Sequence, residues 1–428
     1  MINMYHIPKM GIKHLKMLLS QICKNSGIHY FATVNDFLKS EKTRIYKENV
    51  KNINNPIKQL QLKKAIENKP YFIGIDACLY AARYKRVFRR IEFGFLRQII
   101  MSLSSKIIPI YIFDGNAPNE KRKTITNRQN KKQKIRNKLD NFLLSNGKIK
   151  SDNVENISNL SLEELINYIN NIQNNITEGD FNEKKTESNY LLYDNGDISN
   201  EYNEFVRLAK KSTGMDYEDI KNLKKFLDML KIPYLTANKE ADDLMALLYK
   251  KGIIQACQSD DMDMLPKGCS NVIQISNKGI HQYLLPEILK ELNLNHDQFI
   301  DMCVLLGSDY YTSYLPKIKP FDLYNKFKSN PNLENFIKIY SIDDPKIESH
   351  LENYQVAKKS FINLTEEINT NILDRKIYPF NFDNINEYLN NIGIYLDNNQ
   401  YNKFSSLIKN VNCFVSSIND NLSTYINK

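Results

Sequence analysis

The chain has 428 residues, 42% of them hydrophobic, and a formal net charge of +10. This length predicts one or two folded domains. The six cysteines show no Cys-x-x-Cys spacing, which argues against a disulfide framework and against a zinc site. No secretory signal and no membrane-spanning apolar run is visible, so we expect an intracellular protein without a membrane partner. A basic surface suits a polyanionic substrate, although a merely solvated basic surface would give the same total charge.

The first part of the chain predicts helices and two buried strands. Apolar residues recur at helical spacing from Met10 to Ile22. Residues 35 to 70 are polar and weakly periodic, which suggests helical pieces in a surface excursion. Apolar, β-branched runs at 71–75 and 107–113 predict strands, and the apolar segment 93–103 predicts a buried helix.

Two segments of unusual composition follow. Residues 121–138 are rich in lysine and arginine, whereas residues 152–204 are acidic and rich in asparagine. The low hydrophobicity of the second segment predicts that most of it is disordered, with one short helix at 162–169. Its acidic residues could compete with phosphate for the basic run.

Regular patterns resume near Tyr217. The predicted elements are a helix at 220–230, a strand at 232–235, a helix at 241–249, strands at 253–258 and 271–276, and a buried helix at 299–306. Strands that alternate with helices indicate an α/β fold with a mainly parallel, doubly wound sheet. The last hundred or so residues look largely helical.

Carboxylates stand at or near the ends of several of these elements. They are Asp76, Asp114, Glu240 with Asp242 and Asp243, Asp260 with Asp261 and Asp263, and Asp309. Because the carboxyl ends of parallel strands meet at one edge of a sheet, we expect these side chains to converge. Such a cluster needs cations to stay ionised, and oxygen-only ligands select Mg²⁺ or Mn²⁺. Two such ions about 4 Å apart commonly hydrolyse phosphodiesters.

The closely spaced acidic pairs also have a second interpretation. Glu240 and Asp242 stand at the start of a predicted helix, and Asp261 and Asp263 stand just past a strand. Either pair could cap a helix N-terminus instead of binding metal.

The basic run leaves two interpretations open as well. If the chain after Asp114 is helical, Lys121 and Arg128 share one face that begins beside the carboxylates. Cations placed there could stabilise charge on a reacting phosphate, or they could only contact a nucleic-acid backbone. We expect the backbone contacts from Lys131, Lys132 and Lys134 in either case.

Short motifs follow one another in a particular order. They are Met10–Leu15, Ile75–Ala77, Phe113–Gly115, Ile232–Tyr234 with Lys239–Asp242, Asp261–Asp263 and Leu306–Tyr310. This ordered set resembles the flap endonuclease and xeroderma pigmentosum group G family of 5′ structure-specific nucleases. The resemblance implies a PIN-like nuclease core with a helical arch. Closely similar proteins occur in large DNA viruses, and the bias towards Asn, Lys and Ile fits such a source.

The resemblance also implies roles for individual residues. Two Mg²⁺ ions, which Mn²⁺ could replace, would be held by Asp76, Asp114, Glu240, Asp242, Asp261, Asp263 and Asp309. Lys121 and Arg128 would be catalytic cations on the arch. The implied activity is cleavage of branched or 5′-flapped DNA to leave a 5′ phosphate, with possible 5′–3′ exonuclease activity, during replication, repair or recombination. The alternatives are a 5′–3′ exoribonuclease and a non-catalytic binder of DNA junctions.

The chain departs from the family pattern in several places. Asp242 stands where the family usually has glutamate, and the segment 315–320 lacks the glycines of a DNA-gripping hairpin. We therefore expect Lys317 and Lys319 to contribute to duplex binding. No sliding-clamp motif is visible. We expect a monomer. We also expect it to act in the nucleus or at a cytoplasmic site of viral DNA replication. The expected regions are a nuclease region at 10–120, the arch with its insertion at 121–216, a second nuclease region at 217–330 and a helical region at 331–428.

Overall fold

The computed structural model describes most of the chain. The described residues are 12, 14–23, 26–87, 91–117, 121–145, 208, 215–276, 278–308, 318–340, 347–364, 366, 368 and 377–418. The acidic segment 152–204, with the helix expected at 162–169, lies outside them, as do Asp309 and Lys317.

The chain divides into two compact units. The first comprises residues 1–7, 80–96 and 120–224, and the second comprises residues 8–79, 97–119 and 225–428. The second unit holds the sheet and the carboxylates of the predicted site, apart from Asp309, which is not described. The first unit holds the basic helix α6 (Arg122–Ser145).

The described strands form one sheet in the second unit. They are β1 (Ile28–Phe31), β2 (Tyr71–Asp76), β3 (Ile107–Phe113), β4 (Tyr234–Thr236), β5 (Ala256–Gln258), β6 (Asn271–Ser276) and β7 (Gly279–Leu284). Their order is β1-β7-β6-β5-β2-β3-β4. The run from β6 to β4 is parallel, and β7 is antiparallel to both β6 and β1. The predicted mainly parallel α/β sheet is confirmed.

The central strands show why the apolar runs form a core. Every residue of β2 and β3 is buried, so neither strand alternates between an apolar and a polar face. That pattern is typical of a parallel strand covered by helices on both faces. The strands β4 and β5 are shorter than the sequence predicts, and β1 and β7 were not predicted.

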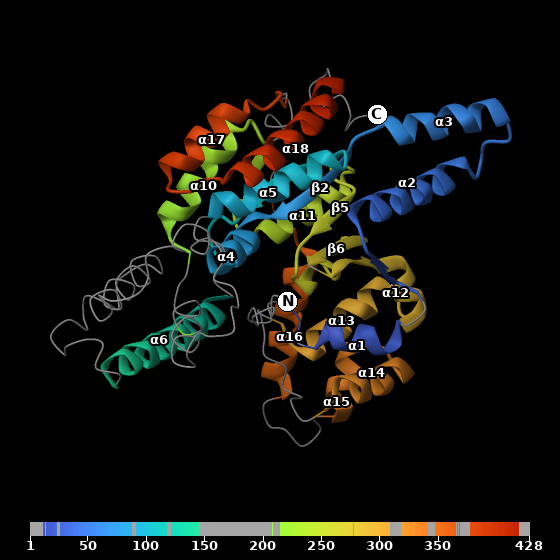
Figure 1. The fold of residues 1–428 in the computed structure, drawn as a ribbon. Helices are drawn as coiled ribbons and strands as arrows, with labels where there is room; N and C mark the ends of the chain where they lie inside the picture. Colours follow the sequence, from blue (N-terminus) through green and yellow to red (C-terminus); the bar gives the residue numbers. More distant parts are fainter. Residues whose placement is uncertain are drawn as a thin grey trace. The chain divides into compact units, whose positions relative to one another are not determined.

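Figure 1 shows the described helices, coloured in chain order from blue to red. Before the basic helix they are α1 (Leu15–Ile22), α2 (Val34–Val50), α3 (Pro56–Asn68), α4 (Ala77–Val87) and α5 (Ile91–Ser104). After it come α10 (Tyr217–Met229), α11 (Ala241–Lys250), the short 3₁₀ helix η3 (Met262–Met264), α12 (Leu285–Leu292) and α13 (His296–Leu306). The C-terminal helices are α14 (Pro320–Ser329), α15 (Leu333–Tyr340), α16 (Ile347–Ile362), α17 (Phe382–Asn391) and α18 (Asn398–Ser417). None of the described helices combines the length and the apolar character that crossing a bilayer requires.

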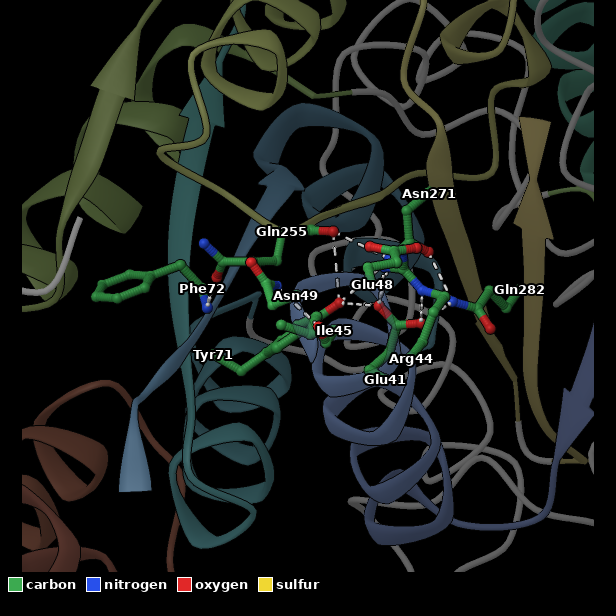
Figure 2. Close-up of polar contacts among 10 residues, drawn as sticks. All are labelled: Glu41, Arg44, Ile45, Glu48, Asn49, Tyr71, Phe72, Gln255, Asn271 and Gln282. Carbon is green, nitrogen blue, oxygen red and sulfur yellow. Dashed lines mark hydrogen bonds and ion pairs between the residues drawn. The ribbon is translucent and has the colours of Figure 1, made fainter. Parts of the chain in front are cut away.

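The surface excursion predicted at 35–70 is the helical hairpin α2–α3. One buried carboxylate, Glu41 of α2, anchors it to the amino-terminal end of β2 (Figure 2). Glu41 accepts hydrogen bonds from the Tyr71 hydroxyl at 2.6 Å and from the Arg44 guanidinium at 2.8 and 2.9 Å. Asn271 and Gln282 each donate a further bond at 2.7 Å.

This anchor is electrostatically satisfied. Burial alone would raise the pKa of Glu41, but the Arg44 hydrogen bonds and charge, with those of its other donors, hold the pKa below its ordinary value. The hairpin is therefore tied to the sheet by an ionised, fully paired carboxylate.

Candidate active site

The site begins at the carboxyl ends of two neighbouring strands. Asp76 is the last residue of β2 and is 6% exposed, whereas Asp114 directly follows β3 and is exposed. In the parallel register Asp76 lies opposite Ile112, so Asp114 stands two residues further along the neighbouring strand. The sheet thus brings the two carboxylates to one edge, as predicted.

Each of these aspartates is held by the start of a helix. The Oδ1 atom of Asp76 accepts a hydrogen bond from the Leu79 N–H at 2.9 Å, at the first turn of α4. The Oδ1 atom of Asp114 accepts one from the Ala241 N–H at 2.9 Å, at the first residue of α11. The Asp114 N–H in turn lies 3.4 Å from the Cys78 sulfur. Asp114 therefore links the end of β3 to the helix that carries the next two carboxylates.

The loop before α11 is held from two sides. The N–H groups of Gly115 and Asn116 donate to the carbonyls of Lys239 and Asn238 at 2.8 and 3.1 Å. A Cβ atom on Gly115 would lie 2.1 Å from the Ala237 carbonyl oxygen, so only glycine permits this approach.

The second support for this loop comes from the C-terminal region. The buried carboxylate of Glu366 accepts hydrogen bonds from the N–H groups of Asn238 and Lys239, both at 2.7 Å. Sequence analysis did not find this residue, because it lies far along the chain in a segment with no recognisable motif.

In the acidic pair at the start of α11, the Glu240 side chain does not cap the helix. Glu240 occupies the N-cap position, but its side chain makes no capping hydrogen bond, and Asp114 contacts the first N–H instead. Glu240 and Asp242 are each 8% exposed. The capping interpretation therefore fails for the Glu240 side chain.

The second pair follows β5. Asp261 is 4% exposed and caps η3 by accepting a hydrogen bond from the Asp263 N–H at 2.9 Å. Its own N–H donates to the Ser259 hydroxyl at 3.1 Å. Asp263 is fully buried. Here the capping interpretation is right for Asp261, and the cap fixes the orientation of its carboxylate.

Electrostatics shows that these groups face a common region. The pKa of Asp76 lies well above its ordinary value, first because of burial and then because of the negative charges of Asp114, Asp242 and Asp261. Residues at the ends of β2, β3 and β5 and at the start of α11 therefore repel one another through a shared space. Positive charge placed in that space would relieve the repulsion.

A fully buried lysine lies on one side of this cluster, and sequence analysis missed it. The Lys267 Nζ atom lies 2.7 Å from Asp243 Oδ1, 3.6 Å from Glu240 Oε2 and 3.9 Å from Asp242 Oδ2. Its sequence context, Leu265-Pro266-Lys267-Gly268, is typical of an exposed turn, and lysines are rarely buried unless paired. The one available indication was its position four residues after Asp263.

Two protein-family models match parts of this sequence. The XPG N-terminal domain model matches residues 50–135, and the XPG I-region model matches residues 231–309. The chain is similar to the flap endonuclease and XPG family in both of these regions. The two matched regions contain all the carboxylates predicted for the site, together with Lys121, Arg128 and Lys267.

Curated relatives carry the same family name. Flap endonuclease 1 of Entamoeba dispar is 28% identical over 277 residues, which cover 63% of this chain and 58% of that protein. Flap endonuclease 1 of Encephalitozoon cuniculi is 33% identical over 162 residues, which cover 36% of this chain and 45% of that protein. The chain thus spans 58% and 45% of the lengths of these two relatives.

A solved structure shares the fold. The catalytic core of Rad2 (complex I) aligns with a TM-score of 0.51 at 15% identity, covering 94% of this chain and 100% of that chain. At this identity the likeness shows a common fold.

The donor set of this chain suits a hard divalent cation. Every predicted ligand offers carboxylate oxygen, which Mg²⁺ and Mn²⁺ prefer, and a bound cation would relieve the repulsion that raises the pKa of Asp76. Within the described part of the chain, no three Asp, Glu, His or Cys side chains stand in a geometry that would hold a metal ion. Asp309, the remaining predicted ligand, lies beyond the described end of α13, which finishes at Leu306.

The described residues among the predicted DNA-contacting cations belong to two helices, α6 and α14, or flank them. Lys121 directly precedes α6, and Arg128, Lys131, Lys132 and Lys134 are exposed on that helix, all in the first unit. Lys319 is the exposed N-cap residue of α14 in the second unit. The basic run is helical from Arg122, but residues 114–117 are not helical and residues 118–120 lie outside the described part of the chain. The helix from Asp114 that the shared-face argument required is therefore not found, and the roles of these residues remain predictions.

Proposed function

We propose that this protein is a metal-dependent, structure-specific 5′ nuclease that hydrolyses phosphodiester bonds in branched or 5′-flapped DNA. The observation that carries the proposal is the convergence of Asp76, Asp114, Asp242 and Asp261 at the carboxyl edge of the sheet. The flap endonuclease relatives support the choice of DNA as substrate.

The proposed metal ligands are the carboxylates predicted from the sequence. They are Asp76, Asp114, Glu240, Asp242, Asp261, Asp263 and Asp309. When bound, two Mg²⁺ ions, or Mn²⁺ in their place, would neutralise the scissile phosphate and favour deprotonation of the attacking water. Asp114 has an additional task, because its contact with Ala241 sets the position of Glu240 and Asp242.

The basic residues are assigned to the substrate. Lys121 and Arg128 would offset the charge that develops on the reacting phosphate. Lys131, Lys132 and Lys134 would contact the phosphate backbone of the same strand, and Lys317 and Lys319 that of a duplex. Such contacts position the DNA without reading its sequence, which suits an enzyme that selects a structure.

The decisive experiment is cleavage of a labelled substrate panel. Flaps, nicks, gaps and four-way junctions of DNA, together with matched RNA flaps, are incubated with the protein in Mg²⁺, in Mn²⁺ and in EDTA. We expect metal-dependent cleavage of the branched DNA with a 5′-phosphate product. Preferential cleavage of RNA would favour an exoribonuclease, and tight junction binding without turnover in either metal would favour a non-catalytic binder.

A further inference from the structure

Lys267 is buried inside the acidic cluster, where a lysine is energetically unusual. Its side chain is 0% exposed. Transfer of an ammonium group from water into a protein interior is costly unless opposite charges compensate. The compensation comes from the first turn of α11, where Asp243 lies at 2.7 Å and Glu240 and Asp242 lie at 3.6 and 3.9 Å.

The distances divide these carboxylates into two groups. The contact with Asp243 is the closest of the three ion pairs. The distances to Glu240 and Asp242 exceed a hydrogen bond, so Lys267 acts on these two groups through its charge alone. Asp243 is therefore the direct partner of the lysine, and the two predicted metal ligands lie beside it.

The backbone places Lys267 together with another predicted ligand. Its N–H donates to the Asp263 carbonyl at 3.2 Å, and the Cys269 N–H donates to the Met264 carbonyl at 3.0 Å. Gly268 completes the turn with a φ of +93°, a conformation that glycine adopts readily. One tight turn thus fixes Lys267 relative to Asp263, so the buried cation is part of the site's framework.

We propose that Lys267 is an internal counter-ion of the carboxylate cluster, which stabilises the fold without divalent ions and lowers the affinity of the site for Mg²⁺. The second half of this inference rests on the proposed function, whereas the first half does not. Positive charge in a low-dielectric site repels an incoming cation and attracts the carboxylates that would bind it. Removal of that charge should therefore destabilise the metal-free protein and tighten metal binding.

The test uses the full chain with Lys267→Met, which keeps an unbranched side chain of similar length and removes its charge. In EDTA, the melting temperature should fall by about 5 °C or more, because buried carboxylates lose their partner. The dissociation constant for Mg²⁺, measured by titration calorimetry, should fall by about tenfold. The rise in melting temperature at saturating Mg²⁺ should be larger than in the parent.

Two further variants make the result specific. Lys290→Met removes an exposed lysine from α12 and should change neither quantity. The double variant Lys267→Met with Asp243→Asn removes both members of the close pair, so it should melt above Lys267→Met alone. If Lys267→Met does not fold, the Mg²⁺ affinity of the double variant is compared with that of the parent instead.

The outcomes separate the two proposals. If the Lys267 variants bind Mg²⁺ no more tightly than the parent, and the parent cleaves DNA, the counter-ion proposal is overturned and the nuclease proposal stands. An unchanged melting temperature in EDTA also overturns the counter-ion. If the parent neither binds Mg²⁺ nor cleaves DNA, the nuclease proposal is overturned. If Lys267→Met also shows the expected loss of stability, the stabilising role of Lys267 stands.

Discussion

The Oδ1 atom of Asp114 accepts a hydrogen bond from the Ala241 N–H at 2.9 Å, so a residue at the end of β3 caps the helix that carries Glu240 and Asp242. Carboxylates favour this position because the N-terminal N–H groups of a helix lack partners and carry partial positive charge. The contact couples two parts of the acidic cluster that lie more than a hundred residues apart.

Substitution at Asp114 should separate this cap from metal binding. We expect Asp114→Ala to abolish cleavage and to lower the free energy of unfolding by about 1 kcal/mol through the lost cap. Asp114→Asn retains an oxygen acceptor, so it should keep the stability and still lose the cleavage. Urea unfolding together with single-turnover cleavage distinguishes the two losses, and full activity in Asp114→Asn would refute a metal-binding role.

Asp263→Ala should abolish cleavage while branched-DNA binding survives. The side chain is fully buried and belongs to the predicted metal set, so it should bind metal and make no contact with the DNA backbone. Binding should hold or tighten, because a negative charge that faces phosphate is removed. Electrophoretic mobility shift and cleavage assays check both halves. Residual turnover within about tenfold of the parent would contradict the two-metal assignment.

Lys121→Ala and Arg128→Ala should each slow single-turnover cleavage by about 10²-fold or more, a typical loss for one charge contact in the transition state. Their affinities for DNA should change little. Lys131→Ala on the same helix is the matched control, and it should weaken binding while saturated cleavage remains normal. If Lys121→Ala and Arg128→Ala behave like the control, both are docking residues.

Glu41→Gln should destabilise the protein by about 3 kcal/mol at neutral pH, because an amide would face the donors that now surround a buried carboxylate. The folded pKa of Glu41 lies below its unfolded value of 4.5. Its contribution is therefore fully present above about pH 4.5 and is lost as the pH falls through the folded pKa.

Urea unfolding at several pH values measures this dependence. The difference in free energy of unfolding between the parent and Glu41→Gln should shrink below pH 4.5. Glu48→Gln is the matched control, because Glu48 pairs with the same Arg44 at 3.0 Å but has a side chain that is 54% exposed. An exposed pair of this kind should contribute less than about 1 kcal/mol. Equal effects of the two substitutions would show that burial of Glu41 is not the source of its contribution.

Glu366→Ala should slow cleavage by about tenfold without preventing folding, because the loop before Glu240 loses two hydrogen bonds to a charged acceptor. The loss of stability should be about 2 kcal/mol. Glu387→Ala, at an exposed position on α17, should change neither property. Normal cleavage by Glu366→Ala would show that the contacts from Asp114 and Gly115 hold the loop on their own.

Much of the framework follows from the sequence. The strands β2 and β3 were predictable because strands buried on both faces are apolar along nearly their whole length, and the buried part of α13 was predictable from its own apolar run. The carboxylates were predictable because they end such elements, and parallel strands bring their carboxyl ends together. The antiparallel strands β1 and β7 were missed because short, half-polar segments carry little periodicity of their own.

Tertiary structure alone decided how the acidic residues are used. Sequence could not tell that Asp261 caps η3 while Glu240 leaves its helix cap to Asp114, since either residue type suits both roles. It also could not place Lys267 or Glu366 at the site. Burial of a charge is favourable only when partners from distant segments surround it, so a local sequence pattern specifies which elements form, and only their packing specifies which charges meet.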